Sequence, residues 1–202
     1  MNLLELLEGQ MSDEVVGQLS TEIRADKDAT QAATSGVFAT LVSALARNAA
    51  KPDSGNSLLN ALDRDHDGSV LNDVMGLFGG STPQPRQKAT NGLGILEHVL
   101  GGNINNVVQM VSKSSGLDFL KTGQLMKLLA PMVMGTLGQT KRKEGLDLGG
   151  LSQILSGTVQ NVTEKRQDMG IISKVLDADG DGNVMDDIAG IGMKVLGGLF
   201  RK

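Results

Sequence analysis

Apolar residues recur along much of the chain at steps of three and four positions, which is the spacing of residues on one face of an α-helix. Residues 37–45, 107–111 and 125–133 carry the clearest stripes of Val, Leu and Met. No segment alternates cleanly between apolar and polar residues, as a half-buried strand would. Aromatic residues, which favour strands, are limited to four Phe. The pattern therefore predicts an all-α protein in which the stripes form the core.

Capping residues predict several helix boundaries. Expected helix starts are at Ser12, Asn103 and Thr122, and expected ends are at Gly101–Gly102, Gly116 and Gly138. The basic residues 141–143 are predicted to form a solvated helix end, where positive charge complements the helix dipole.

A stretch rich in Gly, Pro and Gln, residues 79–92, interrupts the helical pattern. Pro83 and Pro85 fix their φ angles and lack a backbone N–H, so no helix is expected to cross this stretch. We therefore predict a helical unit over residues 1–78, a linker over residues 79–92 and a second helical unit over residues 93–202.

The two units have the features of an internal duplication. Pairs separated by 92 positions are Glu5 and Glu97, Val15–Val16 and Val107–Val108, Leu45 and Leu137, and Leu59 and Leu151. Two acidic segments match at a larger separation of 114 positions, which implies an insertion in the second unit between Leu148 and Asp177. We expect two related helical units, each closing with an acidic loop.

These acidic segments, residues 63–74 and 177–188, contain most of the recognisable chemistry. Both read D-x-D-x-D-G-x-V-x-x-D, and the glycine permits a sharp turn. Carboxylates at alternate positions of a curled loop form the all-oxygen cage that Ca²⁺ prefers, whereas Mg²⁺ and Mn²⁺ suit so large a cage less well. The expected ligands are Asp63, Asp65, Asp67, the Ser69 carbonyl and Asp73 in the first loop, and Asp177, Asp179, Asp181, the Asn183 carbonyl and Asp187 in the second. The sequence thus predicts two EF-hand-like calcium sites.

Both loops depart from the standard EF-hand at its last position. The twelfth residue, usually a bidentate Glu, is Val74 or Ile188, and the closing acid stands one residue earlier. In the second loop Asp186 precedes Asp187, and either could close the cage. These departures predict weaker binding than in a tight calcium buffer. The alternative is a pair of solvated acidic turns, but four crowded carboxylates repel one another unless a cation joins them.

The Leu-rich first helix, the helix containing Val15–Val16, the glycine-punctuated helices and the closing acidic loop together resemble the YidB-like bacterial family, here in tandem duplicate. The resemblance covers nearly the whole chain outside the linker. It implies an all-helical fold and a bacterial source, and it implies no activity, because the family is functionally uncharacterised.

Composition narrows the remaining functions. The chain has no Cys and two His, so thiolate sites and histidine-based triads are not expected, and we predict a non-enzymatic protein. His66, at the fourth loop position, is expected to face solvent, and His98 is expected to be a core or boundary residue. The net charge of −4 and the lack of Tyr and Trp argue against nucleic acid as a partner.

Targeting signals are not recognisable in the sequence. The N-terminus has no basic segment of the kind that begins a signal peptide, and no run approaches the roughly 18 consecutive apolar residues of a membrane span. We expect a cytoplasmic protein without a membrane span, although a non-standard export route stays open.

The expected function is calcium binding by a helical interaction or structural protein, whose partner is another protein or a second copy of itself. Two bound Ca²⁺ ions would cancel the formal net charge of −4, which removes electrostatic repulsion and favours self-association. One alternative is a calcium sensor that exposes a Met-rich groove, since the chain has ten Met. Another is an enzyme that uses calcium structurally.

Overall fold

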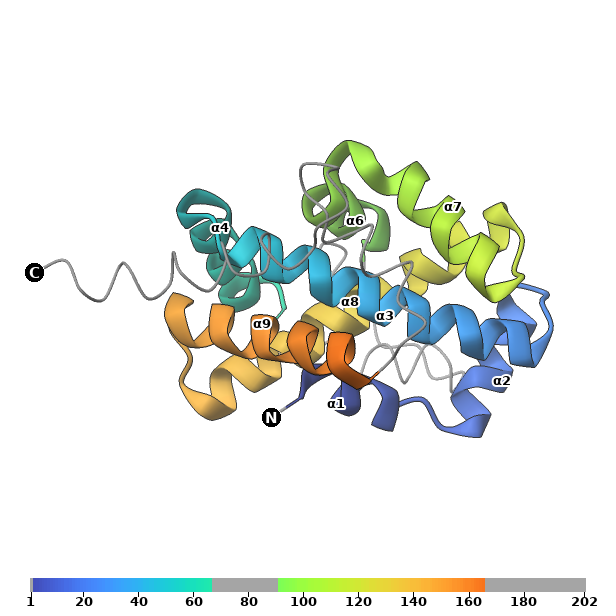
Figure 1. The fold of residues 1–202 in the computed structure, drawn as a ribbon, viewed down its shortest axis with the longest axis horizontal. Coiled ribbons are helices and arrows are strands. Elements are labelled where there is room, and N and C mark those ends of the chain that lie inside the picture. Colours follow the sequence, from blue (N-terminus) through green and yellow to red (C-terminus); the bar gives the residue numbers. More distant parts are fainter. Residues whose placement is uncertain (1, 67–90, 166–202) are drawn as a thin grey trace, which may run out of the picture.

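The computed structural model describes residues 2–66 and 91–165 of the 202-residue chain (Figure 1). Regular structure within these two ranges is helical throughout, which confirms the predicted all-α class for this part of the chain. The helices are α1 (Leu3–Gly9), α2 (Asp13–Glu22), α3 (Lys27–Ala49), α4 (Pro52–Arg64), α6 (Gly92–Leu100), α7 (Ile104–Ser115), α8 (Phe119–Glu144) and α9 (Leu148–Lys165), with a 3₁₀ turn η1 (Gly101–Asn103) before α7.

Helix α3 lies at the centre of the core. Its Phe38, Leu41 and Leu45 side chains are at most 1% exposed, and the helix packs against α4, α7, α8 and α9. In Figure 1, α3 runs through the middle of the molecule between α9 and α7. Among the described residues, α3 is also the one helix long and apolar enough to cross a membrane, and 72% of its most apolar window is buried. Most of the apolar surface of α3 is therefore buried against other helices of the protein.

Both predicted units contribute to this core. Leu3 and Leu62 belong to the same buried cluster as Leu125 and Leu155. Residues 79–90 of the predicted linker lie outside the described ranges, and α6 begins at Gly92, the last residue of that linker. The division into two units stays a prediction. The helices before the predicted linker and those after it share one core.

The junctions that lead into the two long helices have the same backbone conformation. Arg24 and Gly116 are left-handed, with φ of 53° and 74°. Two residues later, Asp26 and Asp118 cap α3 and α8 by accepting backbone N–H groups of the first turn. The left-handed residue reverses the chain, and the aspartate satisfies N–H groups that have no helical acceptor.

Threonine side chains complete both junctions. Thr30 Oγ1 donates to the Asp26 carbonyl at 2.6 Å, and Thr122 Oγ1 donates to the Asp118 carbonyl at 2.8 Å. The backbone N–H of Lys121 donates to the Asp118 carboxylate and thereby lowers the pKa of Asp118. The cap of α8 is therefore ionised at neutral pH.

Most predicted helix boundaries within the described residues are confirmed, and two are wrong. The confirmed boundaries are the starts at Ser12 and Asn103 and the ends at Gly101 and Gly116, although the Asn103 side chain, unlike that of Ser12, does not cap its helix. Thr122 lies inside α8, because Asp118 is the cap and the Thr122 hydroxyl binds the backbone behind it. Gly138 is also inside α8, where burial of the surrounding apolar residues outweighs the modest cost of a helical glycine.

Helices α6 and α8 approach each other closely. Pro131 lies inside α8 and has no N–H, so the carbonyl of Lys127, four residues earlier, lacks its helical donor. Gly92 faces this carbonyl, and a Cβ atom added at Gly92 would lie 1.8 Å from the Lys127 oxygen. Glycine at the start of α6 is therefore a condition of this packing.

Candidate functional site

Helix α4 carries the start of the first predicted calcium loop. Leu58 and Leu62 are buried on one face of this helix and fix it to the core. The helix ends at Arg64, so Asp63 lies in its last turn and Asp65 directly follows it. Asp63 is exposed and Asp65 is half-buried. The first loop positions thus coincide with a helix end, as they do in a helix–loop–helix calcium motif.

The other predicted ligands lie outside the described residues. They are Asp67, Ser69 and Asp73 of the first loop and Asp177, Asp179, Asp181, Asn183 and Asp187 of the second. Over residues 2–66 and 91–165, no three His, Asp or Glu residues are grouped so that they could hold a metal ion. Asp63 and Asp65 are therefore two members of a predicted ligand set whose remaining members are not described.

Asp63 forms an ion pair with a distant helix. The ammonium group of Lys141 contacts Oδ1 of Asp63. Lys141 lies in the basic last turn of α8, as predicted, but its side chain is only 15% exposed. The prediction of a solvated helix end is wrong for Lys141, because its side chain is directed to α4 instead of to solvent.

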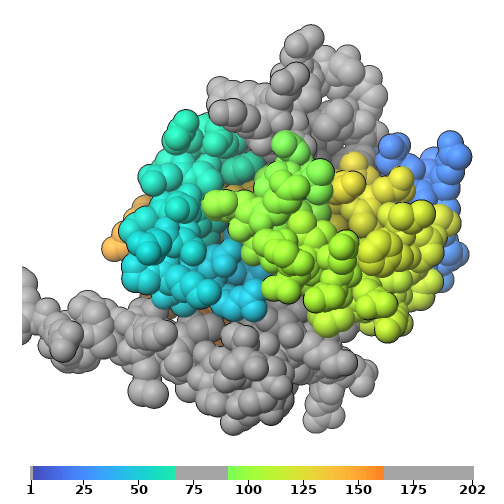
Figure 2. Space-filling model, turned by 90° about the horizontal axis from the view of Figure 1, so that it is seen from above, coloured from blue at the N-terminus to red at the C-terminus, as the bar shows by residue number. Residues whose placement is uncertain are grey.

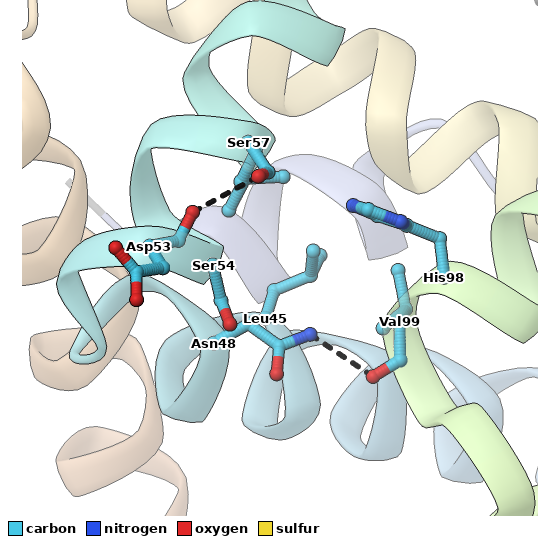
Figure 3. A pocket seen from close by; sticks show the side chains of 8 residues that line it. Leu45, Asn48, Asp53, Ser54, Ser57, His98 and Val99 are labelled. Carbon is cyan, nitrogen blue, oxygen red and sulfur yellow. Dashed lines mark hydrogen bonds between the residues drawn. The ribbon is translucent and has the colours of Figure 1, made fainter.

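A groove lies between α4 and α6, next to the end of α3. Figure 2 shows the surfaces of α4 and α6 on one face of the molecule. Part of the groove is a cavity of about 200 Å³, whose lining residues are Leu45, Asn48, Asp53, Ser54, Ser57, Leu58, His98 and Val99 (Figure 3). Asn48 Nδ2 donates to the Val99 carbonyl at 3.0 Å and so connects α3 to α6. The His98 imidazole extends across the groove toward α4.

A second cavity of about 290 Å³ shares Ser57, His98 and Val99 with the first. It is also lined by His66, so both histidines of the chain border one groove. His66 is only 5% exposed and His98 is exposed, which reverses the predicted placement of the two side chains. Their convergence has no signal in the sequence, because it depends on how α4 and α6 both pack on α3 and α8.

The groove has hydrogen-bonding groups, and the hydroxyl of one of its serines, Ser57, is not paired with a base. Ser57 Oγ donates to the Asp53 carbonyl at 2.9 Å, so its proton is directed to the backbone of its own helix and not to an imidazole. A serine nucleophile needs a base that accepts this proton. Among the described lining residues, Asp53 is the one carboxylate, and its side chain is exposed.

Comparison with known proteins connects the chain to one family description. The family model for "bacterial protein of unknown function (DUF937)" matches residues 5–140. The matched range extends from α1 into α8 and contains the first acidic loop. No curated protein and no solved structure matches the chain.

Proposed function

The chain belongs to the bacterial DUF937 family, whose function is unknown, and we propose that this protein is a non-enzymatic calcium-binding interaction or structural protein. Its two acidic loops, residues 63–74 and 177–188, would each hold one Ca²⁺ ion. The bound ions would fix the direction in which the chain leaves the helix before each loop.

The position at which α4 ends carries this proposal. A chain can place alternate carboxylates around a cation only if it leaves the helical conformation close to the first ligand. Helix α4 ends at Arg64, the second loop position, and the backbone N–H groups of Asp65 and His66 both donate to the Ala61 carbonyl, at 3.0 Å and 3.2 Å. The helix therefore closes at the point where a calcium loop has to begin.

The proposal treats the two loops as equivalent members of a duplicated unit. The matched junctions at Arg24–Asp26 and Gly116–Asp118, which are 92 positions apart, support duplication of the helices that precede the loops, whereas the loops themselves are 114 positions apart. So does the burial of Leu45 and Leu137, which have the same separation and are each at most 1% exposed. The left-handed residue, the Asp cap and the buried Leu are each found twice, 92 positions apart, which is the separation of the residue pairs in the sequence.

A structural role for calcium is favoured over a sensor role. A sensor would expose a Met-rich groove when calcium opens its helices. Among the described residues, Met126, Met132 and Met134 are at most 2% exposed and are packed in the shared core, and Met134 also lines the second cavity of the groove. Their burial supports a structural role, because a sensor would have to expose such side chains.

Binding of an apolar fluorescent dye tests this choice. We expect the dye signal of the full chain to fall when calcium replaces a chelator, because the ion orders the loop ends and reduces exposure of the neighbouring apolar side chains. The control is magnesium at the same ionic strength. A calcium-dependent rise in dye fluorescence would instead support the sensor.

Self-association remains part of the proposal. Two Ca²⁺ ions would neutralise the formal net charge of −4 and remove the repulsion between copies. Sedimentation with calcium and with chelator measures this directly, and a monomer under both conditions would eliminate self-association.

A further inference from the structure

Exposed apolar side chains are few in the part of the chain that the structure describes. Four large ones are exposed there, namely Leu6 on α1, Leu93 on α6, and Phe119 and Leu120 at the start of α8. Leu120 is 75% exposed, and the adjacent Phe119 is 43% exposed. Contact with another molecule would remove this adjacent pair from water, which is favourable.

The helices around Phe119 and Leu120 are basic. Across α7 and α8, residues 104–143 contain six Lys or Arg and one acid, which gives a formal charge of +5. The one acid is Asp118, which caps α8 and pairs with Lys121 at 3.4 Å. Lys113 lies in the last turn of α7, and Lys127 lies in the first half of α8. We call Lys113, Phe119, Leu120, Lys121 and Lys127 the basic surface.

The opposite charge is concentrated on α1 and α2. Residues 2–23 contain five acids and no Lys or Arg, which gives a formal charge of −5. Leu6 is 39% exposed, and Glu5 beside it is exposed as well. Lys27 of α3 pairs with Asp13 at 2.6 Å, which reduces the negative charge of these helices but does not cancel it. We call Glu5, Leu6, Glu8, Asp13 and Glu14 the acidic surface.

The two surfaces lie on different sides of the molecule. Helices α1 and α7 both pack against α3, and in Figure 1 α7 lies along the upper side of the molecule and α1 along the lower side. Figure 2, seen from above, shows α7 in yellow-green on the near face. One copy therefore cannot bring its own two surfaces together, whereas two copies can.

We infer that the basic surface of one copy binds the acidic surface of the next copy, so that the protein associates head to tail through α8 and α1. This inference rests on the self-association included in the proposed function and does not require calcium. Opposite charges attract the two surfaces, and Phe119, Leu120 and Leu6 leave water at the contact. Each copy keeps one surface unused, so the contact extends beyond a pair.

Sedimentation of the full chain in chelator tests the inference without any effect of calcium. The wild-type chain is expected to associate as its concentration rises, and less so at high salt. Leu120→Glu would face the acidic surface with a like charge, and Leu6→Lys would do the same to the basic surface. Each should weaken association at least about tenfold. Glu in the first turn of α8 and Lys in the last turn of α1 suit the helix dipoles, so the melting curves should show folded variants.

An equimolar mixture of the two variants gives the sharpest result. Neither variant should associate alone, but the mixture should, because each variant keeps the surface that the other has lost. The matched controls are Lys143→Gln and Asp53→Asn, which make the same changes in net charge at exposed positions outside both surfaces. Each control should stay within about twofold of the wild type, since charges in water are strongly screened.

The outcomes separate the inference from the function on which it rests. If the wild-type chain associates but Leu6→Lys or Leu120→Glu associates equally well, or if their mixture stays monomeric, the inference is overturned and self-association stands. A wild-type chain that is monomeric with and without calcium overturns both, while calcium binding by the loops is unaffected. A monomeric wild-type chain that sediments with phosphatidylglycerol vesicles, and loses this binding in Leu120→Glu, would assign the basic surface to a membrane and also overturn the inference.

Discussion

Removal of calcium is expected to lower the melting temperature of this protein by roughly 10–20 °C. An ion present at a hundredfold its dissociation constant stabilises the folded state by about 2.7 kcal/mol, so two sites contribute about 5 kcal/mol. In a chain of this size, each kcal/mol corresponds to about 2–4 °C. Thermal unfolding followed by circular dichroism, in millimolar calcium and in excess chelator, measures the difference.

Variants show whether the loops cause this stabilisation. Asp177→Ala should remove about half of the calcium-dependent shift, because one of the two sites is lost. Asp53→Ala is the control, since Asp53 is an exposed acid of α4 that lies outside both loops. The Asp53→Ala protein should keep the full shift. Identical wild-type melting curves in calcium and chelator would mean that the loops are only acidic turns.

Replacement of Gly92 by Ala is expected to lower the free energy of unfolding by about 3 kcal/mol, the upper part of the range for overpacked positions. The added Cβ would lie 1.8 Å from the Lys127 oxygen and 2.6 Å from its carbonyl carbon. These are backbone atoms of α8, so no side-chain rotation can relieve the clash, and α6 has to move away from α8. Denaturant unfolding monitored by circular dichroism gives this change.

Gly123→Ala provides the matched control for Gly92→Ala. Gly123 also lies in a helix, but the nearest atom to an added Cβ is Val108 Cγ1 at 4.0 Å, an ordinary contact. Alanine favours the helical conformation over glycine, so Gly123→Ala should leave stability unchanged or raise it by up to about 1 kcal/mol. Equal effects of the two substitutions would show that α6 and α8 do not approach as closely as described.

The helices were predictable because their signals are local. The stripe over residues 37–45 lies in the core, where α3 is buried on all sides, and Val107, Val108 and Val111 became the buried face of α7. Capping is also a short-range property, which is why Ser12 and Gly116 were identified correctly. Thr122 was assigned wrongly as a start, because a hydroxyl that can cap a helix can equally bind a carbonyl within one.

Contacts between distant helices had no comparable signal. The pairing of Lys141 with Asp63 depends on how α4 packs against α8. The convergence of His66 and His98 depends on how α4 and α6 both pack on α3 and α8. Residue spacing does not encode that packing. The sequence around Gly92 also does not show why glycine is required there. The carbonyl that Gly92 faces belongs to α8, and it lacks a helical donor because of Pro131 on that helix.

For the candidate site, the sequence predicted a helix before the acidic segment but not the lysine that contacts Asp63. Asp63 and Asp65 lie at the end of α4, where the loop motif places them. The lysine that contacts Asp63 was expected in solvent, because a run of basic residues at a helix end is usually hydrated. The structure thus adds an ion pair between α8 and α4 next to the predicted loop.

Calcium titration calorimetry on the wild-type chain tests calcium binding by the two loops most directly. We expect close to two ions bound per chain, about one in Asp63→Ala or Asp177→Ala, and none in the double variant. The far-ultraviolet spectrum of each variant in chelator should match that of the wild type, which shows that the helices are retained. No heat of binding in the wild type, or undiminished binding in the double variant, would contradict the assignment of calcium to these loops.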